Sequence, residues 1–124
     1  MSLKIALDEQ SPLITIALSG RLDTNTAPEL DDALNGILTN TKIACLTFDL
    51  AQLDYLSSAG VRCFIRSRKA IEPRGGRVVI VNPQPAVRKV LDIVKAIPPG
   101  GVFESVAELD EYLDAMQRKV REQT

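Results

Sequence analysis

Residues 53–71 read "LDYLSSAGVRCFIRSRKAI", and the hydrophobic pattern changes within them at two adjacent serines. An apolar run ends at Leu56, whereas from Ser58 onward the apolar residues recur with the period of a helix. The apolar side of that helix consists of Val61, Phe64, Ile65 and Ile71. The chain therefore passes from strand to helix at Ser57 and Ser58, and three kinds of site fit such a junction: a nucleophile, a phosphate-binding turn and a phosphorylation site.

Two strands are expected ahead of this junction. In "LKIALD", Leu3, Ile5 and Leu7 alternate with polar or small residues, which is the period of a half-buried strand. The stretch "SPLITIALSG" at residues 11–20 repeats the alternation. Because the connection between the two is short, they are expected to pair as an antiparallel hairpin.

A helix is expected to follow the hairpin and to open in "TAPEL", residues 26–30. Thr26 and Glu29 have the spacing of a capping box, and Pro28 is tolerated there because the first helical amides have no partner within the helix. The apolar stripe of this helix consists of Leu30, Leu34, Ile37 and Leu38. Asp23, just ahead of the helix, is expected to form an Asx turn or a cap.

Two further strands are almost continuously apolar, as buried strands are, and the first of them suits a central strand covered by neighbours on both sides. They are the segments 43–48 in "KIACLTFDL" and 77–82, "RVVIVN". The helix that starts at Ser58 joins them, and Pro73 with the glycines of "EPRGG" ends it. A strand–helix–strand connection of this kind is expected to be a right-handed parallel crossover.

Two more helices are expected to complete the chain. The inner side of the first consists of Val87, Val90, Leu91 and Val94. "VF" at 102–103 is expected to add a very short edge strand, and the last helix opens with a second capping box from Ser105 to Glu108. Its buried side consists of Val106, Leu109, Tyr112, Leu113 and Met116. Residues 118–124 are expected to form a frayed tail.

The order β-β-α-β-α-β-α-α predicts an α/β fold with a mixed sheet of four to five strands and about four helices. The chain has 124 residues, 45 % of them hydrophobic and 25 % charged, which is ordinary for a soluble globular protein. No repeat or linker divides it. We therefore expect a single domain over residues 1–124.

The charge balance argues against nucleic acid and membranes as partners. Fifteen Lys and Arg residues face sixteen Asp and Glu, for a net charge of −1, and only 4 % of the residues are aromatic. No apolar run approaches the ~20 residues that a membrane helix needs, and the first residues are too charged for a signal peptide. Since Cys45 and Cys63 make no disulfide framework, a cytoplasmic location is expected.

The sequence contains no histidine, which removes the commonest general base near neutral pH and the commonest metal ligand. The G-x-S-x-G motif is absent around Ser58, and Lys69 lies three turns along the helix, too far to act as its base. "SSAG" also lacks the Gly-Lys-Ser/Thr of a phosphate loop, although a nucleotide at a bare helix N-terminus stays open. No catalytic residue, metal or cofactor is therefore expected.

Each remaining candidate also has a purely structural interpretation. Ser57 or Ser58 can cap the helix with its side-chain oxygen, which stabilises a helix by ~1 kcal/mol. Cations at positions i, i+4 and i+7 of the same helix form a basic stripe, which is either a solvated face or a docking surface for an acidic partner. They are Arg62, Arg66 and Lys69. Cys63, beside the stripe, is expected to behave as a small, partly buried hydrophobe.

Two segments together resemble the STAS family, which includes the anti-sigma factor antagonists of bacteria. They are "FDLAQLDYLSSAGVR", residues 48–62, and "GRLDTNTAPEL", residues 20–30. In the family pattern, a strand ends in a hydrophobic-Asp-Leu element, a short loop follows, and Asp-Ser-Ser-Gly or a close variant then opens a helix. In this chain, Asp49 and Leu50 match the first element, and residues 58–60 match the last. The resemblance covers essentially the whole chain, because the element order matches and residues 102–113 resemble the closing segment of the family.

The resemblance implies a phosphorylation switch. In the family, a serine kinase that is itself the anti-sigma factor phosphorylates the serine matched here by Ser58. The dephosphorylated antagonist binds this kinase and displaces its sigma factor, and a metal-dependent serine phosphatase restores it. Asp23 matches the acidic residue of the loop beside that serine. The partner-facing surface that the resemblance implies consists of Asp23, Thr24, Asn25, Ser57, Ser58, Gly60, Val61, Arg62 and Arg66.

One position departs from the family pattern, because Ser57 stands where the Asp precedes the phosphorylated serine. The change removes a negative charge that can orient or repel phosphate, and it lets Ser57 compete with Ser58 for modification. A constitutive STAS adapter of a stress-signalling complex or a transporter, without a phosphorylation cycle, therefore stays an alternative. A homodimer is also left open.

Overall fold

The computed structural model of the chain describes residues 3–96 and 106–123. Its strands form one four-stranded sheet in the spatial order β1-β2-β3-β4. They are β1 (Leu3–Gln10), β2 (Leu13–Leu22), β3 (Cys45–Leu56) and β4 (Arg77–Val81). β1 is antiparallel to β2, whereas β2, β3 and β4 run parallel. The predicted hairpin and the predicted parallel pairing of β3 with β4 are therefore confirmed. The prediction that residues 77–82 form a buried strand is wrong, because β4 lies at the edge of the sheet and its residues 78–81 are only half-buried.

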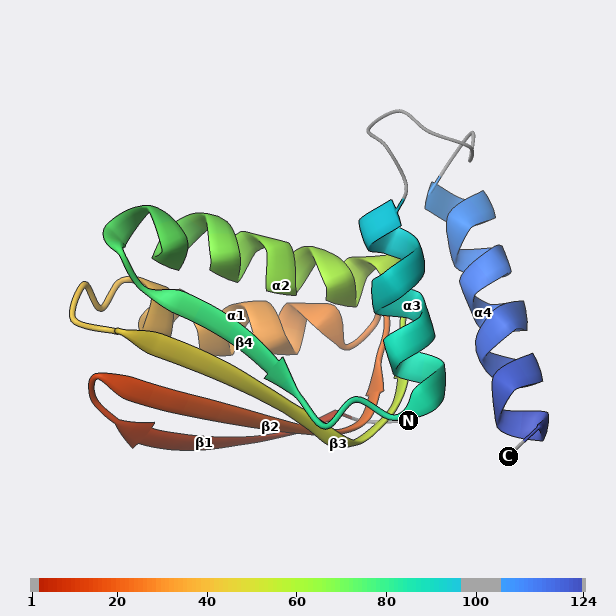
Figure 1. Cartoon of the computed structure of the whole chain (residues 1–124), viewed down its shortest axis with the longest axis horizontal. Coiled ribbons are helices and arrows are strands. Elements are labelled where there is room, and N and C mark those ends of the chain that lie inside the picture. Colours follow the sequence, from red (N-terminus) through yellow and green to blue (C-terminus); the bar gives the residue numbers. More distant parts are fainter. Residues whose placement is uncertain (1–2, 97–105, 124) are drawn as a thin grey trace.

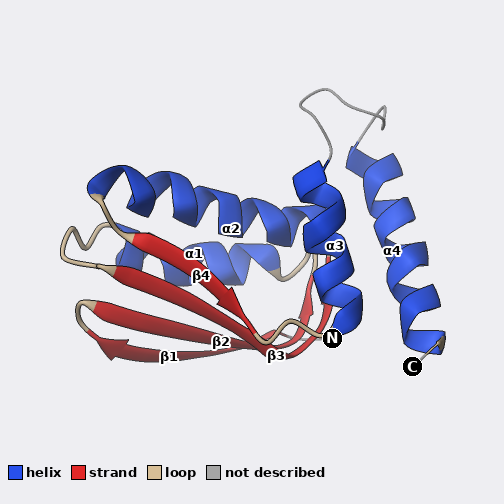
Figure 2. Ribbon diagram, viewed as in Figure 1, coloured by secondary structure: helices blue, strands red, loops and turns tan. Residues whose placement is uncertain are grey.

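The described helices follow the strands in the predicted order. They are α1 (Ala27–Leu38), α2 (Ser58–Ile71), α3 (Pro85–Ala96) and α4 (Val106–Glu122), with a 3₁₀ turn at Glu72–Arg74 after α2. α1 and α2 lie on one face of the sheet, and α3 and α4 stand side by side at one end (Figure 1). Figure 2 shows the same layers, with strands red and helices blue. Among these helices, none is long and apolar enough to cross a membrane.

The α/β class with a mixed sheet is confirmed, whereas the C-terminal end differs from the prediction. α4 continues to Glu122, into the stretch from residue 118 for which a frayed tail was expected. The predicted edge strand at 102–103 and the predicted capping residue Ser105 lie outside the described residues.

The core lies between the sheet and the helices α1 and α2. Alternate residues of β2 point toward these helices, so that Ile14, Ile16 and Leu18 are at most 2 % exposed. On β3, Phe48 is buried against Phe64 of α2, with the ring centroids 4.7 Å apart. Burying each such side chain stabilises the fold by ~1.5–3 kcal/mol. The strand and helix periodicities of the sequence thus meet in one apolar layer.

β3 is longer than the sequence indicated, because it runs on from Leu50 to Leu56 where a short loop was expected. Its register with β2 shifts at two irregularities, opposite Ala17–Ser19 and Gly20–Arg21, and at each of them β3 carries one extra residue. Such bulges bend and twist a strand locally, and Leu53 within the extension stays fully buried. The two strands end opposite each other at the pair Leu22 and Leu56. The segments that follow them therefore leave the sheet side by side.

Gly60, in the first turn of α2, packs against these strand ends. A Cβ at Gly60 would lie 2.6 Å from Leu22 Cγ and 2.6 Å from Leu56 Cδ1. We expect Gly60→Ala to lower the free energy of unfolding by about 1–3 kcal/mol, the usual cost of overpacking, as measured by urea denaturation.

Gly36→Ala is the matched control, because a Cβ at Gly36 in α1 would meet nothing within 4 Å. There the better helix propensity of alanine is expected to raise the free energy of unfolding by up to about 1 kcal/mol. Equal effects of the two substitutions would show that Gly60 has no packing role.

Candidate functional site

The loop after β2 is organised by Asp23. Its carboxylate oxygen Oδ1 accepts the backbone N–H of Asn25 at 2.9 Å and that of Thr26 at 3.1 Å, which is the expected Asx turn. The Thr26 hydroxyl donates to the carbonyl of Arg21 at 2.8 Å and makes no capping bond to α1. The predicted capping box of Thr26 and Glu29 is therefore wrong, because the threonine side chain holds the loop against β2 instead.

Ser57 and Ser58 form the junction between β3 and α2, next to that loop. Ser57 has an extended backbone and donates its N–H to the carbonyl of Leu22 at 2.9 Å. Ser58 is the first residue of α2, and its N–H donates to Oδ1 of Asp110 on α4 at 2.9 Å. Both serine hydroxyl oxygens are buried, and neither has a hydrogen-bond partner among the described residues.

The prediction that a serine side chain caps α2 is wrong, because Ser57 occupies the N-cap position without a side-chain hydrogen bond. The acceptor comes from Asp110 instead, and a carboxylate at a helix N-terminus is stabilised by the helix dipole by ~0.3–1 kcal/mol. Asp110 was missed in the sequence because it lies 52 positions from Ser58. No local pattern indicates where a polar side chain of one helix will meet the end of another.

Gln117 holds α4 over this junction. Its side chain is fully buried; Oε1 accepts the N–H of Leu56 at 3.0 Å, and Nε2 donates to the carbonyl of Leu56 at 2.8 Å. The side-chain amide thus pairs with the end of β3 as a neighbouring strand would, and each backbone group left unpaired would cost ~1–3 kcal/mol. Sequence reasoning missed Gln117, although a signal existed: a polar residue one turn after Leu113 in the apolar stripe of the helix.

A groove of about 520 Å³ lies between α1 and α2. It is lined by Thr24 of the Asp23 loop, by Ala59 next to Ser58, and by the predicted basic stripe. Within it, Arg66 forms an ion pair with Asp31 at 2.9 Å and also donates to Asn35. Such an exposed pair stabilises the fold by only ~0–1 kcal/mol. Another acidic group can therefore take the place of Asp31 on Arg66 at little cost.

The structure brings the predicted partner-facing residues to one corner of the molecule, but not all of them to its surface. Those with exposed side chains are Thr24, Asn25, Arg62 and Arg66. Asp23 and Ser58 are half-buried. Those that are buried are Ser57, Gly60 and Val61. These three residues are covered because the first turn of α2 packs on the sheet and must bury one side, and their part in a partner surface stays a prediction.

Cys63 lies on the buried side of α2, where it is 2 % exposed, with Sγ 3.4 Å from Oδ1 of Asp31. Burial, and next the Asp31 carboxylate, raise the pKa of the Cys63 thiol to about 12. The thiol therefore stays neutral, as a small hydrophobe does. Within the described residues, no three His, Cys, Asp or Glu side chains are grouped so as to hold a metal ion.

We expect the folded protein to protect Cys63 from alkylation at mildly alkaline pH, because only a thiolate reacts and this thiol is both neutral and buried. Cys45 is partly exposed and should react without denaturant. Iodoacetamide labelling followed by peptide mass spectrometry measures the two sites separately. Labelling of Cys63 at the rate of Cys45 in the folded protein would contradict the expectation.

The same thiol gives stability a pH dependence of known sign. The pKa of Cys63 is about 12 in the folded protein against 9.0 ordinarily, so the unfolded chain loses the proton first as pH rises. The stabilisation of the fold that results from this raised pKa is complete below pH 9 and is lost as the pH rises from 9 to about 12. A Cys63→Ala protein should lack this part of the alkaline destabilisation.

Comparison with known proteins shows the family to which the chain belongs. The model of the STAS domain matches residues 4–109. The anti-sigma F factor antagonist of Paenibacillus polymyxa is 22 % identical over 116 residues, which are 94 % of this chain and 94 % of that protein.

Solved structures show the same fold. The unphosphorylated form of the anti-sigma factor antagonist SpoIIAA is similar with a TM-score of 0.68 at 22 % identity, over 74 % of this chain and 81 % of that one. The phosphorylated form of SpoIIAA from Bacillus is similar with a TM-score of 0.62 at 21 % identity, over 73 % and 83 %. Since the family model spans most of the sequence, the expected resemblance is confirmed, and this chain belongs to the STAS domain family.

Proposed function

We propose that this STAS domain is an anti-sigma factor antagonist whose affinity for its partner is switched by phosphorylation of Ser58. Dephosphorylated, it binds an anti-sigma factor serine kinase and so releases a sigma factor; a metal-dependent serine phosphatase reverses the modification. The name of the Paenibacillus relative and the serine motif support this assignment. The chain then acts in the cytoplasm as a binding module and not as an enzyme.

One observation carries the proposal: the N-terminus of α2 already accommodates an anionic oxygen next to Ser58. The amide of Ser58 donates to a carboxylate oxygen of Asp110 at 2.9 Å. A phosphoryl group adds a charge of about −1.5 to −2, and the helix dipole with its free amides favours such a charge by ~0.3–2 kcal/mol. Phosphorylation of Ser58 is therefore compatible with the fold.

Ser58 is better placed than Ser57 to receive the phosphate. Ser57 is 3 % exposed, and its N–H is bonded to Leu22 at the end of β2. Exposing its hydroxyl would disrupt the sheet. Ser58 is half-buried, and the contact at its amide comes from a side chain of α4. A kinase therefore reaches Ser58 once the first half of α4 moves, with the strand ends left in place.

A phosphate on Ser58 opposes the charge of Asp110. Two unit charges 4 Å apart repel by ~1 kcal/mol in water and by ~4 kcal/mol at an effective dielectric constant of about 20. The phosphate carries nearly two charges, so this repulsion exceeds the dipole stabilisation of the Asp110 carboxylate. The phosphate then replaces Asp110 at the helix start, while Gln117 keeps the second half of α4 on Leu56.

The same charge acts more strongly on a docked partner. The exposed residues around the junction and the groove, among them Thr24, Asn25, Arg62 and Arg66, form the partner surface. An unpaired charge desolvated in an interface costs ~2–5 kcal/mol, and each ~1.4 kcal/mol is tenfold in affinity. Phosphorylation should therefore weaken binding roughly thirty- to several-thousand-fold while leaving the fold intact.

A second function is favoured by a specific observation. The hydroxyl oxygen of Ser58 is buried in this conformation, and Ser57 replaces the acidic residue of the family pattern. Both features suit a constitutive STAS adapter that presents the same surface without a phosphorylation cycle. The two functions differ in whether Ser58 ever carries phosphate in the cell.

Mass spectrometry of the protein recovered from its native cells, resting and stressed, with phosphatases blocked, separates them. We expect a phosphoryl group on Ser58 whose occupancy varies with condition. Wild-type, Ser58→Ala and Ser58→Asp proteins then serve as baits: the alanine variant should retain the kinase, and the aspartate variant should lose it at least thirtyfold with an unchanged circular dichroism spectrum. An unmodified Ser58 in every condition, with equal kinase capture by all three baits, would favour the adapter.

The contact between Asp110 and Ser58 yields a separate prediction. In protein made with phosphoserine at position 58, hydrogen exchange measured by mass spectrometry should increase in the first half of α4, up to Leu113, and change little around Gln117. Asp110→Asn removes the repelling charge and keeps an acceptor oxygen, so it should reduce this increase severalfold.

Glu111→Gln is the matched control, because it removes the neighbouring exposed charge of α4 and should leave the phosphorylation-induced exchange as in wild type. If phosphorylated and unphosphorylated proteins exchanged α4 identically, Asp110 would not be displaced. That outcome would not contradict the proposal that Ser58 is phosphorylated.

A further inference from the structure

The edge strand β1 carries features that the proposed function does not use. β1 is eight residues long and pairs only with β2 among the described strands, so one side of its backbone has no strand partner. From Lys4 to Gln10, every residue except Ile5 is exposed. A long edge of this kind can take up a further strand.

The side of β1 that faces the helices is also incompletely covered. Leu7 is 44 % exposed, although it lies on the same face as the buried Leu3. Next to it, a hollow of about 270 Å³ opens between the sheet and α1, lined among others by Leu7, Ile14, Ala33 and Ile37. Apolar groups added beside Leu7 would cover this surface.

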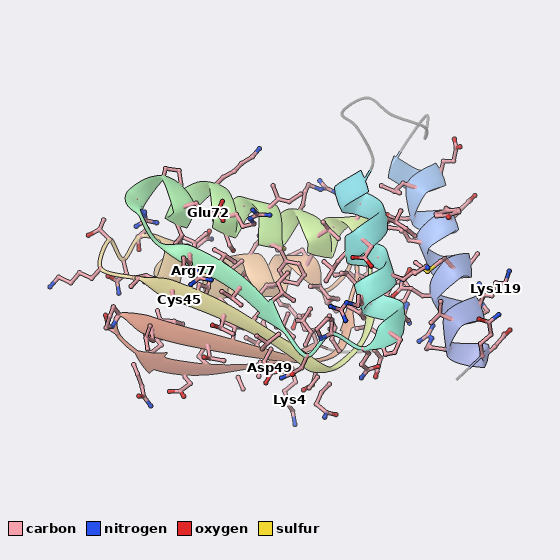
Figure 3. All side chains as sticks on the ribbon, in the orientation of Figure 1. Lys4, Cys45, Asp49, Glu72, Arg77 and Lys119 are labelled. Atoms are coloured by element: carbon pink, nitrogen blue, oxygen red, sulfur yellow. The ribbon has the colours of Figure 1, made fainter. Side chains whose placement is uncertain are left out.

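The opposite side of β1 carries charges of both signs at symmetric positions. Lys4 and Asp8 alternate with the helix-facing residues and flank Ala6 at equal distance. Figure 3 shows Lys4 extending from the sheet on the side away from the helices. A strand with this pattern is complementary to its own antiparallel copy.

We propose that β1 pairs antiparallel with β1 of a second copy of this chain, with Ala6 on the two-fold axis. Lys4 then lies opposite Asp8 of the second copy on one face, and Ile5 lies opposite Leu7 of the second copy on the other. The four strands of each copy join into one continuous sheet. The contact is isologous, as two-fold dimers are.

The register follows from symmetry and charge. Because side chains alternate between the faces, a two-fold axis must bring a residue opposite its own copy. If the two-fold axis passed through Ile5, Lys4 would lie opposite Ala6 of the second copy. If it passed through Leu7, Ala6 would lie opposite Asp8 of the second copy. Either register therefore loses both ion pairs between Lys4 and Asp8. Only the axis at Ala6 forms two opposite-charge pairs and two Ile–Leu pairs, the cross-strand contacts that stabilise sheets.

Sedimentation equilibrium of charge variants tests the pairing. Wild type should show a concentration-dependent dimer, and Lys4→Asp and Asp8→Lys should each raise its dissociation constant at least tenfold, because like charges then face each other. Mixing these two variants should restore association, now as heterodimers, and the doubly swapped Lys4→Asp/Asp8→Lys protein should dimerise by itself. A variant that merely fails to fold cannot give this recovery.

A cysteine at the axis supplies a second readout. In a Cys45→Ser background, Ala6→Cys should form a disulfide-linked dimer on mild oxidation, because facing residues of antiparallel strands lie ~4.5–5.5 Å apart, within disulfide reach. Gln10→Cys is the control, since the proposed register separates its two copies by more than about 20 Å. A wild type that stays monomeric to its solubility limit, with no cross-link at position 6, would overturn the proposal and show that Lys4 and Asp8 instead keep edges apart.

Discussion

The candidate site depends on the parallel pairing of β2 and β3 at their last residues, Leu22 and Leu56. Because both strands run in the same direction and end together, the Asp23 loop and the serine junction leave the sheet side by side. The N–H of Ser57 bonds to the carbonyl of Leu22, and the guanidinium of Arg21 lies 3.9 Å from the ring centroid of Tyr55. Two register shifts, at each of which β3 carries one extra residue, bring Leu56 opposite Leu22.

α4 adds a second layer of control at the same point. Gln117 completes the hydrogen bonding of Leu56, so the second half of the helix is part of the sheet end. Asp110, two turns earlier, satisfies the first amide of α2 instead. The two contacts differ in kind: a buried amide pair is costly to break, whereas a carboxylate at a helix start can be exchanged for another anion. A helix held firmly at one end and electrostatically at the other suits the proposed opening of the site without unfolding.

The proposed partner surface and the proposed dimer edge use different parts of the sheet. The serine junction follows β3 in the interior of the sheet, and the dimer edge is β1 at its margin. Their physical requirements also differ. The first needs exposed cations and a helix start that accepts negative charge, while the second needs unpaired backbone and self-complementary side chains. Each can therefore be altered without disturbing the other.

The sequence by itself determined the order of elements, the hairpin, the parallel pairing of β3 with β4 and the position of Ser58 at the start of a helix. These follow from local periodicity, from glycine and proline positions, and from short turns, all of which act within a few residues. The Asx turn at Asp23 was predictable for the same reason.

The tertiary structure alone decided the length of β3, the burial of Ser57 and Gly60, and the partner of the first amide of α2. Local rules assigned helix caps to Thr26 and to the serines, yet the Thr26 hydroxyl holds Arg21 and a carboxylate from α4 meets Ser58. Side-chain groups compete for the free amides at a helix start, and the group that lies nearest in space binds them. Residues 52 positions apart, such as Ser58 and Asp110, become neighbours only after the chain has packed. Periodicity shows which face of a helix is apolar, but the burial of each residue is fixed by what packs against that face.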